Sequence, residues 1–101
     1  MRLPRFDIPD DRNATFCQRW QIVELSLFGS VLREDFDTES DVDVLVHFDP
    51  GVDWSLLDLM TMQSELSTLL DRHVDPVEQA GLRNPFRRAA IIQSKQVVYA
   101  A

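Results

Sequence analysis

The fold of this chain is decided by residues 27–46, LFGSVLREDFDTESDVDVLV. They begin in a segment, residues 21–28, where Val23, Leu25 and Leu27 alternate with polar side chains, the period of a half-buried strand. They end in a second segment, residues 41–48, whose β-branched content also predicts a strand. Because a polar connection joins the two, we expect neighbouring strands with a loop between them.

The remaining elements are predicted from helix caps and apolar periodicity. Asp10 or Asp11 is expected to cap a helix that runs to about residue 20, and Asp53 a second helix over residues 54–70. The apolar stripe of the second helix consists of Leu56, Leu59, Met62, Leu66 and Leu69. A short strand over residues 72–79, a helix from about residue 84 and an extended piece at residues 97–99 follow. The order α-β-β-α-β-α predicts an α/β (α+β) fold in which helices pack on a small mixed sheet.

Length, charge and cysteine content limit what this chain can be. Its 101 residues predict a single domain, residues 1–101, with one core and one site. The net charge of −7 argues against direct nucleic-acid binding, and no apolar run suits a membrane span or a secretory signal. Since Cys17 is the single cysteine, we expect a cytoplasmic protein without disulfides or structural zinc. The acid-free stretch 81–101 suits either an anionic partner surface or a solvated helix face.

Two carboxylates project together from the second predicted strand. Residues two apart share one face of a strand, so Asp41 and Asp43 point the same way while Val42 and Val44 face the core. Like charges side by side repel, and a cation between them relieves the repulsion. Oxygen ligands of this kind suit Mg²⁺, which proteins hold with one or two carboxylates plus substrate phosphates. A solvated strand face would carry the same residues, so this pattern alone leaves both interpretations open.

Gly29 and Ser30 end the first predicted strand. Since glycine has no Cβ, the backbone there can turn tightly and a phosphate can come close, and the Ser30 hydroxyl adds a hydrogen-bond donor. An ordinary turn explains a lone Gly-Ser pair equally well. In combination with a loop, residues 31–40, that returns two carboxylates beside the pair, the pattern favours a site for phosphate and metal.

This combined motif resembles the nucleotidyltransferase signature of the DNA polymerase beta superfamily. That signature is Gly-Ser, a spacer, and Ser-Asp-x-Asp followed by apolar residues, here Gly29-Ser30 and Ser40-Asp41-Val42-Asp43. The chain's brevity narrows the resemblance to the minimal nucleotidyltransferases, often encoded beside a HEPN-domain toxin. The resemblance covers nearly all of residues 16–99 and implies a polymerase-beta-like nucleotidyltransferase fold. Two departures are Glu34, where many relatives carry glycine, and Pro76, where many carry an apolar residue.

The resemblance implies roles for seven residues. The catalytic, metal-binding carboxylates would be Asp41, Asp43 and Asp75, with two Mg²⁺ ions as cofactors and ATP as the substrate. The nucleotide would be bound by Gly29, Ser30, Arg33 and Ser40. Asp75 is assigned as the third carboxylate of the family pattern because it follows the apolar residue Val74. An aspartate that starts a turn before Pro76 explains the same residues. Arg33 has an equally simple interpretation as a solvated loop residue, and Pro76, which has no backbone N–H, predicts an edge strand or a strand end.

The resemblance also implies a function for the chain. It would be an antitoxin that transfers AMP from ATP to a hydroxyl, expected to be a tyrosine, of a cognate HEPN ribonuclease toxin. Chain length agrees, because larger relatives that modify antibiotics or RNA carry additional domains to bind the acceptor. Two alternatives stay open: a non-catalytic antitoxin that acts by binding and occlusion, and the catalytic subunit of a small-molecule or RNA nucleotidyltransferase.

Four further residues near these motifs are given structural interpretations. His47 and His73 are expected to be surface residues at strand ends. Trp20 and Trp54 are expected in helix and core packing, which explains large aromatic side chains more simply than adenine stacking does.

Overall fold

The sheet of this protein has four strands in the order β3-β2-β1-β4, as seen in a computed structural model that describes residues 7–32 and 41–101. The strands are β1 (Ile22–Phe28), β2 (Val42–Phe48), β3 (Val74–Glu78) and β4 (Gln96–Ala100). β1 runs antiparallel to both β2 and β4, whereas β2 and β3 are parallel. The predicted mixed sheet is therefore confirmed, and β3, which contains Pro76, is an edge strand as expected.

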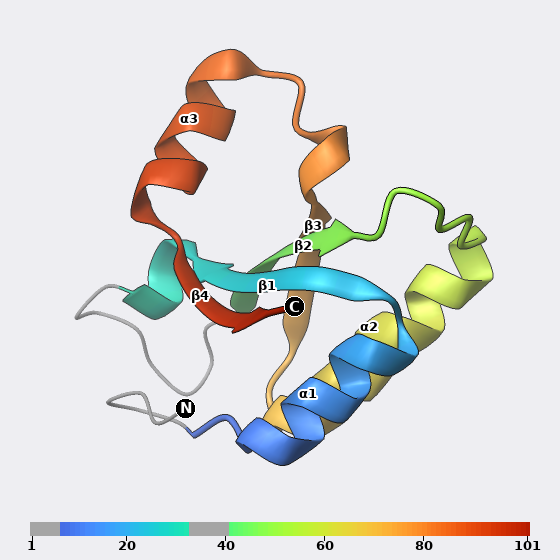
Figure 1. Cartoon of the computed structure of the whole chain (residues 1–101). Coiled ribbons are helices and arrows are strands. Elements are labelled where there is room, and N and C mark those ends of the chain that lie inside the picture. The colour runs from blue at the N-terminus through green and yellow to red at the C-terminus, as the bar shows by residue number, and fades with distance from the viewer. Residues whose placement is uncertain (1–6, 33–40) are drawn as a thin grey trace.

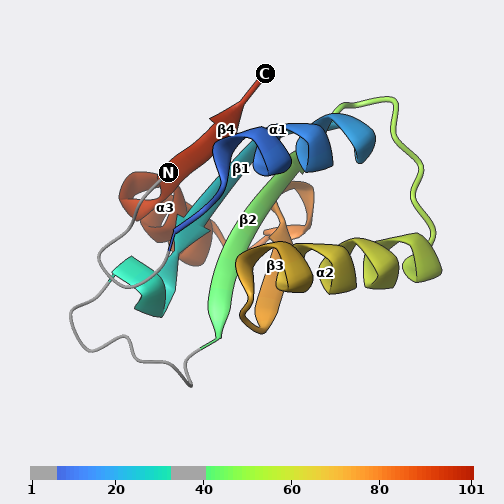
Figure 2. The same ribbon diagram turned by 90° about the horizontal axis from the view of Figure 1, so that it is seen from below.

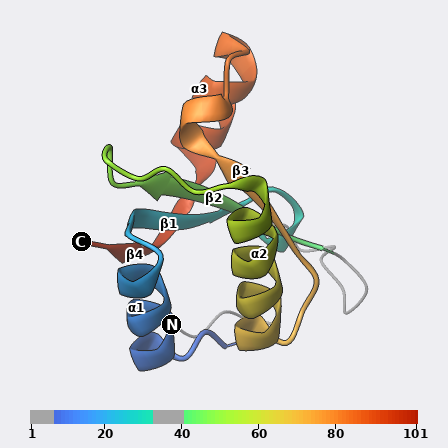
Figure 3. The ribbon, with the colours of Figure 1, turned by 90° about the vertical axis from the view of Figure 1, so that its right-hand side faces the viewer.

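Helices cover both faces of the sheet. α1 (Asp10–Arg19) and α2 (Leu56–Leu70) lie on one face, and α3 (Pro85–Ser94) lies on the other (Figures 1 and 3). Figure 2 shows α1 and α2 side by side across the strands. α2 also supplies the crossover that two parallel strands require. Within the described residues, no helix is long and apolar enough to cross a bilayer.

The core is divided between the two faces. The larger cluster lies under α1 and α2, where Val42, Val44 and Val46 of β2 are fully buried, as predicted for alternate strand positions. A smaller cluster lies under α3 and consists of Phe28, Leu45, Leu82 and Ile91, with Val77 packed against it. Because β1 and β2 contribute to both clusters, the central strands are buried on both faces.

The predicted caps of the first two helices are wrong in detail. Pro9, not an aspartate, occupies the N-cap of α1, and Asp10 and Asp11 lie in its first turn, where negative charge is favourable. α2 is capped by Ser55 instead of Asp53, through a capping box in which Ser55 and Asp58 each bond the other's backbone N–H. Leu56, predicted as core, is 75% exposed because the first turn of α2 extends beyond the ends of the strands (Figure 1).

The two tryptophans have structural roles, as expected. Trp20 and Trp54 pack edge to face, with ring centroids 5.0 Å apart and an interplanar angle of 66°. The Trp54 Nε1–H donates to the Trp20 carbonyl oxygen at 3.0 Å, and the Trp20 Nε1–H donates to Glu65 Oε2 at 3.1 Å. These bonds join the end of α1 to the start and the middle of α2.

Ser26 of β1 is buried where the alternation of its strand predicts a half-exposed polar position. α3 covers that face, so the side chain is fully buried, and its hydroxyl has no hydrogen-bond partner among the described residues. A buried hydroxyl without a partner costs about 1–3 kcal/mol. We expect Ser26→Ala to leave the free energy of unfolding unchanged or to raise it by about 1 kcal/mol in urea titrations.

Asn13 provides the matched control for this substitution. It is equally buried, but its Nδ2 donates to the Val98 carbonyl oxygen at 3.2 Å. Asn13→Ala should therefore lower the free energy of unfolding by about 1–3 kcal/mol. A comparable loss in Ser26→Ala would mean that the Ser26 hydroxyl is hydrogen-bonded in solution.

Cys17 of α1 lies in the larger core cluster, and burial raises the pKa of its thiol from 9.0 to about 12. The unfolded chain therefore loses this proton above pH 9, while the folded chain keeps it. Stability falls with rising pH wherever the folded state binds more protons. Relative to Cys17→Ala, the wild type should lose up to about 1.4 kcal/mol per pH unit above pH 9, measured by urea unfolding. A pH-independent difference between the two proteins would contradict this.

Candidate active site

The candidate site lies at one end of the sheet, where β1 ends and β2 and β3 begin. In the strand register, Phe28 lies opposite Asp43, and Asp43 lies opposite Asp75. Neighbouring strands are about 4.8 Å apart, so Asp43 and Asp75 are adjacent positions of one row across the sheet. The Val42 N–H donates to the His73 carbonyl oxygen at 2.9 Å, which fixes the start of this parallel pair.

Gly29 follows β1 directly and makes room for one of these carboxylates. Its φ is +75°, the left-handed region that glycine adopts without steric cost. A Cβ at this position would lie 2.5 Å from Asp43 Oδ2, so the carboxylate occupies the space of the missing side chain. The sequence indicates the need for a tight turn at Gly29. It does not indicate the contact with Asp43, because that depends on the register between β1 and β2.

Ser30 connects the turn after β1 to the start of β2. Gly29–Leu32 forms a short 3-10 turn, η1, from which the Ser30 hydroxyl donates to the Asp41 carbonyl oxygen at 3.4 Å. Asp41 and Asp75 are exposed and Asp43 is half-buried, so solutes can reach all three side chains. The structure thus brings together Gly29, Ser30, Asp41, Asp43 and Asp75. The other two predicted nucleotide-binding residues, Arg33 and Ser40, lie outside the described residues.

The carboxylate oxygens of the site suit a hard cation that takes its remaining ligands from water and substrate. Within residues 7–32 and 41–101, no three His, Cys, Asp or Glu side chains converge closely enough to hold a metal ion by themselves. Mg²⁺ commonly takes only one or two carboxylates and completes its shell with water and substrate phosphates. Asp43 beside Asp75, next to a glycine turn that a phosphate can approach, meets that requirement. The set of three carboxylates stays a prediction.

Three other polar residues have no part in the row of carboxylates. His47 and His73 are exposed at opposite ends of β2 and β3, which agrees with their structural interpretation. Lys95, from the acid-free stretch, forms an ion pair with Glu24, its Nζ lying 2.5 Å from Oε2. This pair joins the end of α3 to β1, and no sequence signal could reveal it because its members are 71 positions apart.

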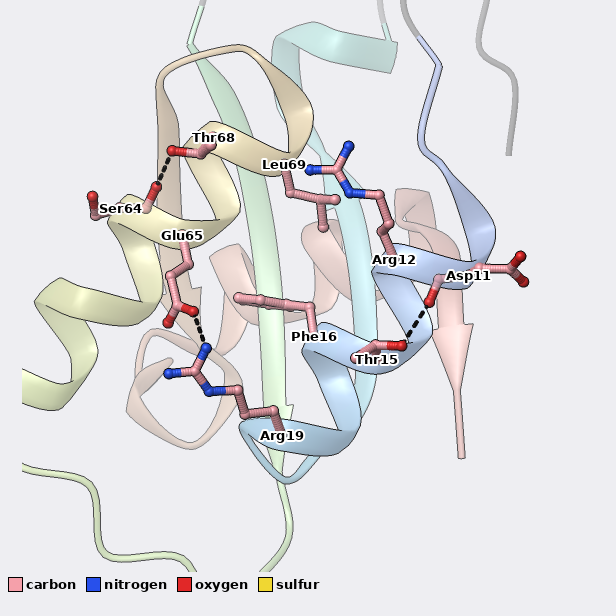
Figure 4. A pocket seen from close by; sticks show the side chains of 9 residues that line it. All are labelled: Asp11, Arg12, Thr15, Phe16, Arg19, Ser64, Glu65, Thr68 and Leu69. Carbon is pink, nitrogen blue, oxygen red and sulfur yellow. Dashed lines mark hydrogen bonds and ion pairs between the residues drawn. The ribbon is translucent and has the colours of Figure 1, made fainter.

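A cavity of about 530 Å³ lies elsewhere, between α1 and α2 on the opposite face of the sheet from α3 (Figure 4). Phe16 and Leu69 provide its apolar walls, and Arg19 forms an ion pair with Glu65 at one end. The predicted site residues that the structure describes, Gly29, Ser30, Asp41, Asp43 and Asp75, do not line this cavity. It therefore belongs to the packing of the two helices and is separate from the candidate active site.

Comparison with known proteins identifies the family. The nucleotidyltransferase domain family matches residues 13–98, which include Gly29, Asp43 and Asp75. Protein adenylyltransferase MntA of Thermococcus cleftensis is 32% identical over 82 residues, which are 81% of this chain and 78% of that protein.

Solved structures share the fold. A protein assigned as a minimal nucleotidyltransferase has a TM-score of 0.70 at 32% identity, over 86% of each chain. A complex of tri-AMPylated Shewanella oneidensis HEPN toxin with an MNT antitoxin has a TM-score of 0.63 at 15% identity, over 91% of this chain and 70% of that chain. The second similarity concerns the fold alone, whereas the first extends to the sequence. With its Gly-Ser turn and aspartates inside the matched region, the chain belongs to the nucleotidyltransferase domain family.

Proposed function

We propose that this chain is an antitoxin nucleotidyltransferase that transfers AMP from ATP to a hydroxyl, expected to be a tyrosine, of a HEPN-domain toxin and so neutralises it. The observation that carries the proposal is the adjacent pair Asp43 and Asp75 on β2 and β3, with the Asp43 carboxylate in the space that Gly29 leaves open. Similarity to protein adenylyltransferase MntA supports a protein as the acceptor. The AMP-modified HEPN toxin bound by an MNT antitoxin supports the class of partner.

Mg²⁺ is the cofactor that this donor set fits, and we propose that Asp41, Asp43 and Asp75 hold two such ions together with the triphosphate. The bound ions would polarise the phosphate oxygens and make the acceptor hydroxyl more acidic. Asp41 and Asp43 would help to hold both ions, whereas Asp75 would help to hold only one of them. Loss of Asp75 should therefore impair transfer more than it impairs ATP binding.

The chain's own residues position the reactants for one displacement. The acceptor oxygen forms a bond to the α-phosphorus of ATP, the bond from that phosphorus to the β-phosphate oxygen breaks, and pyrophosphate leaves. The backbone at Gly29 and the Ser30 hydroxyl hold the β- and γ-phosphates, with Arg33 and Ser40 contributing from the connecting loop. Asp75 accepts the proton of the acceptor hydroxyl. Holding both reactants in line replaces an improbable encounter in water with a nearly unimolecular step.

Intact-mass spectrometry tests the proposed function directly. The purified chain is incubated with ATP, Mg²⁺ and the HEPN-domain protein encoded beside it. We expect the partner to gain about 329 Da, the mass of one AMP unit, for each transfer. Omission of Mg²⁺, with EDTA present, should prevent the gain. A partner that is silenced in a stable complex without any gain in mass would instead establish neutralisation by occlusion.

A further inference from the structure

The first turn of α2 carries a cluster of exposed apolar side chains. Leu56, Leu57 and Met60, here called the α2 patch, are 75%, 73% and 57% exposed. By contrast, Met62 and Leu66, further along the same helix, are buried in the larger core cluster. Single exposed apolar residues are common, but a contiguous group next to a hollow is typical of an interaction surface.

The α2 patch continues into a groove at the end of the sheet opposite the aspartates. Leu56 and Met60 line a cavity of about 160 Å³ between α2 and the β3 edge. A second cavity of about 460 Å³ lies beside it and shares the lining residues Phe48, Leu59 and Glu78. The two cavities therefore adjoin along these shared residues, and the smaller one has apolar walls from α2 and β2.

The charges around this groove are negative. The larger cavity is lined by the carboxylates of Asp49, Asp53 and Glu78, with His47 beside them. Among the described residues that line either cavity, there is no lysine or arginine. An acidic rim around an apolar floor favours a partner that presents apolar side chains flanked by lysine or arginine.

The groove is well separated from the candidate active site. Asp43 and Phe48 are five positions apart on β2, which at about 3.3 Å per residue places them roughly 17 Å apart. A protein bound at the α2 patch would therefore leave the aspartates open. It could be held there while a segment of it that bears the acceptor hydroxyl reaches the row of carboxylates.

We propose that the α2 patch and its acidic groove are the docking surface for the acceptor protein, an inference that rests on the proposed function. A ribonuclease needs basic surface to bind its polyanionic substrate, so its charge complements the acidic rim. A second copy of this chain has the same net charge of −7 and is repelled. Binding at the groove would hold the acceptor hydroxyl near the α-phosphate of ATP, although the groove itself does not contact ATP.

The test compares two apolar surfaces of the chain. In one variant, Leu57→Ser and Met60→Ser remove most of the α2 patch. In the control, Phe86→Ser removes a side chain of α3 that is 85% exposed and lies on the other face of the sheet. Titration calorimetry with the neighbouring HEPN-domain protein should show Kd raised about 10- to 100-fold for the patch variant and by less than about twofold for the control.

Kinetics separate docking from catalysis. For the patch variant, KM for the acceptor protein should rise about as much as Kd, whereas KM for ATP and kcat at saturating acceptor should stay unchanged. Asp53→Asn with Glu78→Gln should weaken binding and reduce its dependence on salt. Thermal unfolding of each variant would confirm that the fold is intact.

Each outcome bears on one of the two proposals. Unchanged Kd and acceptor KM in the patch variant would overturn the docking surface while leaving AMP transfer standing. A wild type that forms dimers, with patch variants that are monomeric, would identify a second copy as the occupant and also overturn it. Absence of AMP transfer by the wild type would refute the proposed function, and the calorimetric comparison would still decide whether the partner uses this groove.

Discussion

Replacement of Asp41 and Asp43 by alanine is expected to abolish AMP transfer, lowering kcat/KM by at least about 10³-fold, while the chain still folds. Loss of a single preorganised electrostatic contact to a transition state costs about 10²–10³-fold, and this variant removes two. Both carboxylates lie at the edge of the fold, since Asp41 is exposed and Asp43 is half-buried. The measurement is the intact mass of the acceptor protein after incubation with ATP and Mg²⁺.

The control for this variant is Asp11→Ala, which removes an exposed carboxylate from the first turn of α1 that is not one of the assigned site residues. It should transfer AMP at the wild-type rate. Both proteins should show cooperative thermal unfolding. If the Asp41/Asp43 variant folds and retains transfer, the catalytic residues lie elsewhere and the assigned site is wrong.

Gly29→Ala is expected to have the second largest effect, because it acts on backbone and site together. An alanine in the left-handed region costs about 1–2 kcal/mol, which for a chain of this size lowers Tm by roughly 4–16 °C. The new Cβ would also lie 2.5 Å from Asp43 Oδ2, so the carboxylate must move. Because reacting groups tolerate little misplacement, we expect transfer to fall about 10²-fold. Calorimetric melting and the rate of pyrophosphate release measure the two effects.

Gly81→Ala is the matched control. Gly81 ends the short turn η2 (Gln79–Gly81), and apart from its chain neighbours a Cβ there would meet no atom of the described residues within 4 Å. This substitution should leave transfer unchanged and Tm within a few degrees of the wild type. Equal melting temperatures for Gly29→Ala and the wild type would show that the turn after β1 is not constrained as described.

The parts of the fold that were predicted correctly depend on local patterns. β1 and β2 follow from alternating or β-branched runs, and α3 begins after Asn84, whose side chain caps it by accepting from the Phe86 and Arg87 N–H groups. The placement of Asp75 beside Asp43 follows from element order, because parallel strands joined by a helix begin at the same end of a sheet.

The wrong predictions concern burial that depends on contacts between residues far apart in the sequence. Ser26 was expected on a half-exposed face of the sheet. That face is covered by α3, which lies much later in the sequence. Leu56 fits the apolar periodicity of α2, yet periodicity does not show where the underlying strands end. The capping pair Ser55 and Asp58 would have corrected the start of α2 from sequence alone.

The position of Pro76 in β3 has a consequence for behaviour at high concentration. β3 is a sheet edge, and an open edge can template pairing with strands of other molecules, which is a route to aggregation. Pro76 offers no N–H to an incoming strand, and Glu78 adds a charge that opposes close stacking. Asp75 can therefore lie on an exposed edge strand, accessible to an acceptor, while that strand resists pairing with strands of other molecules.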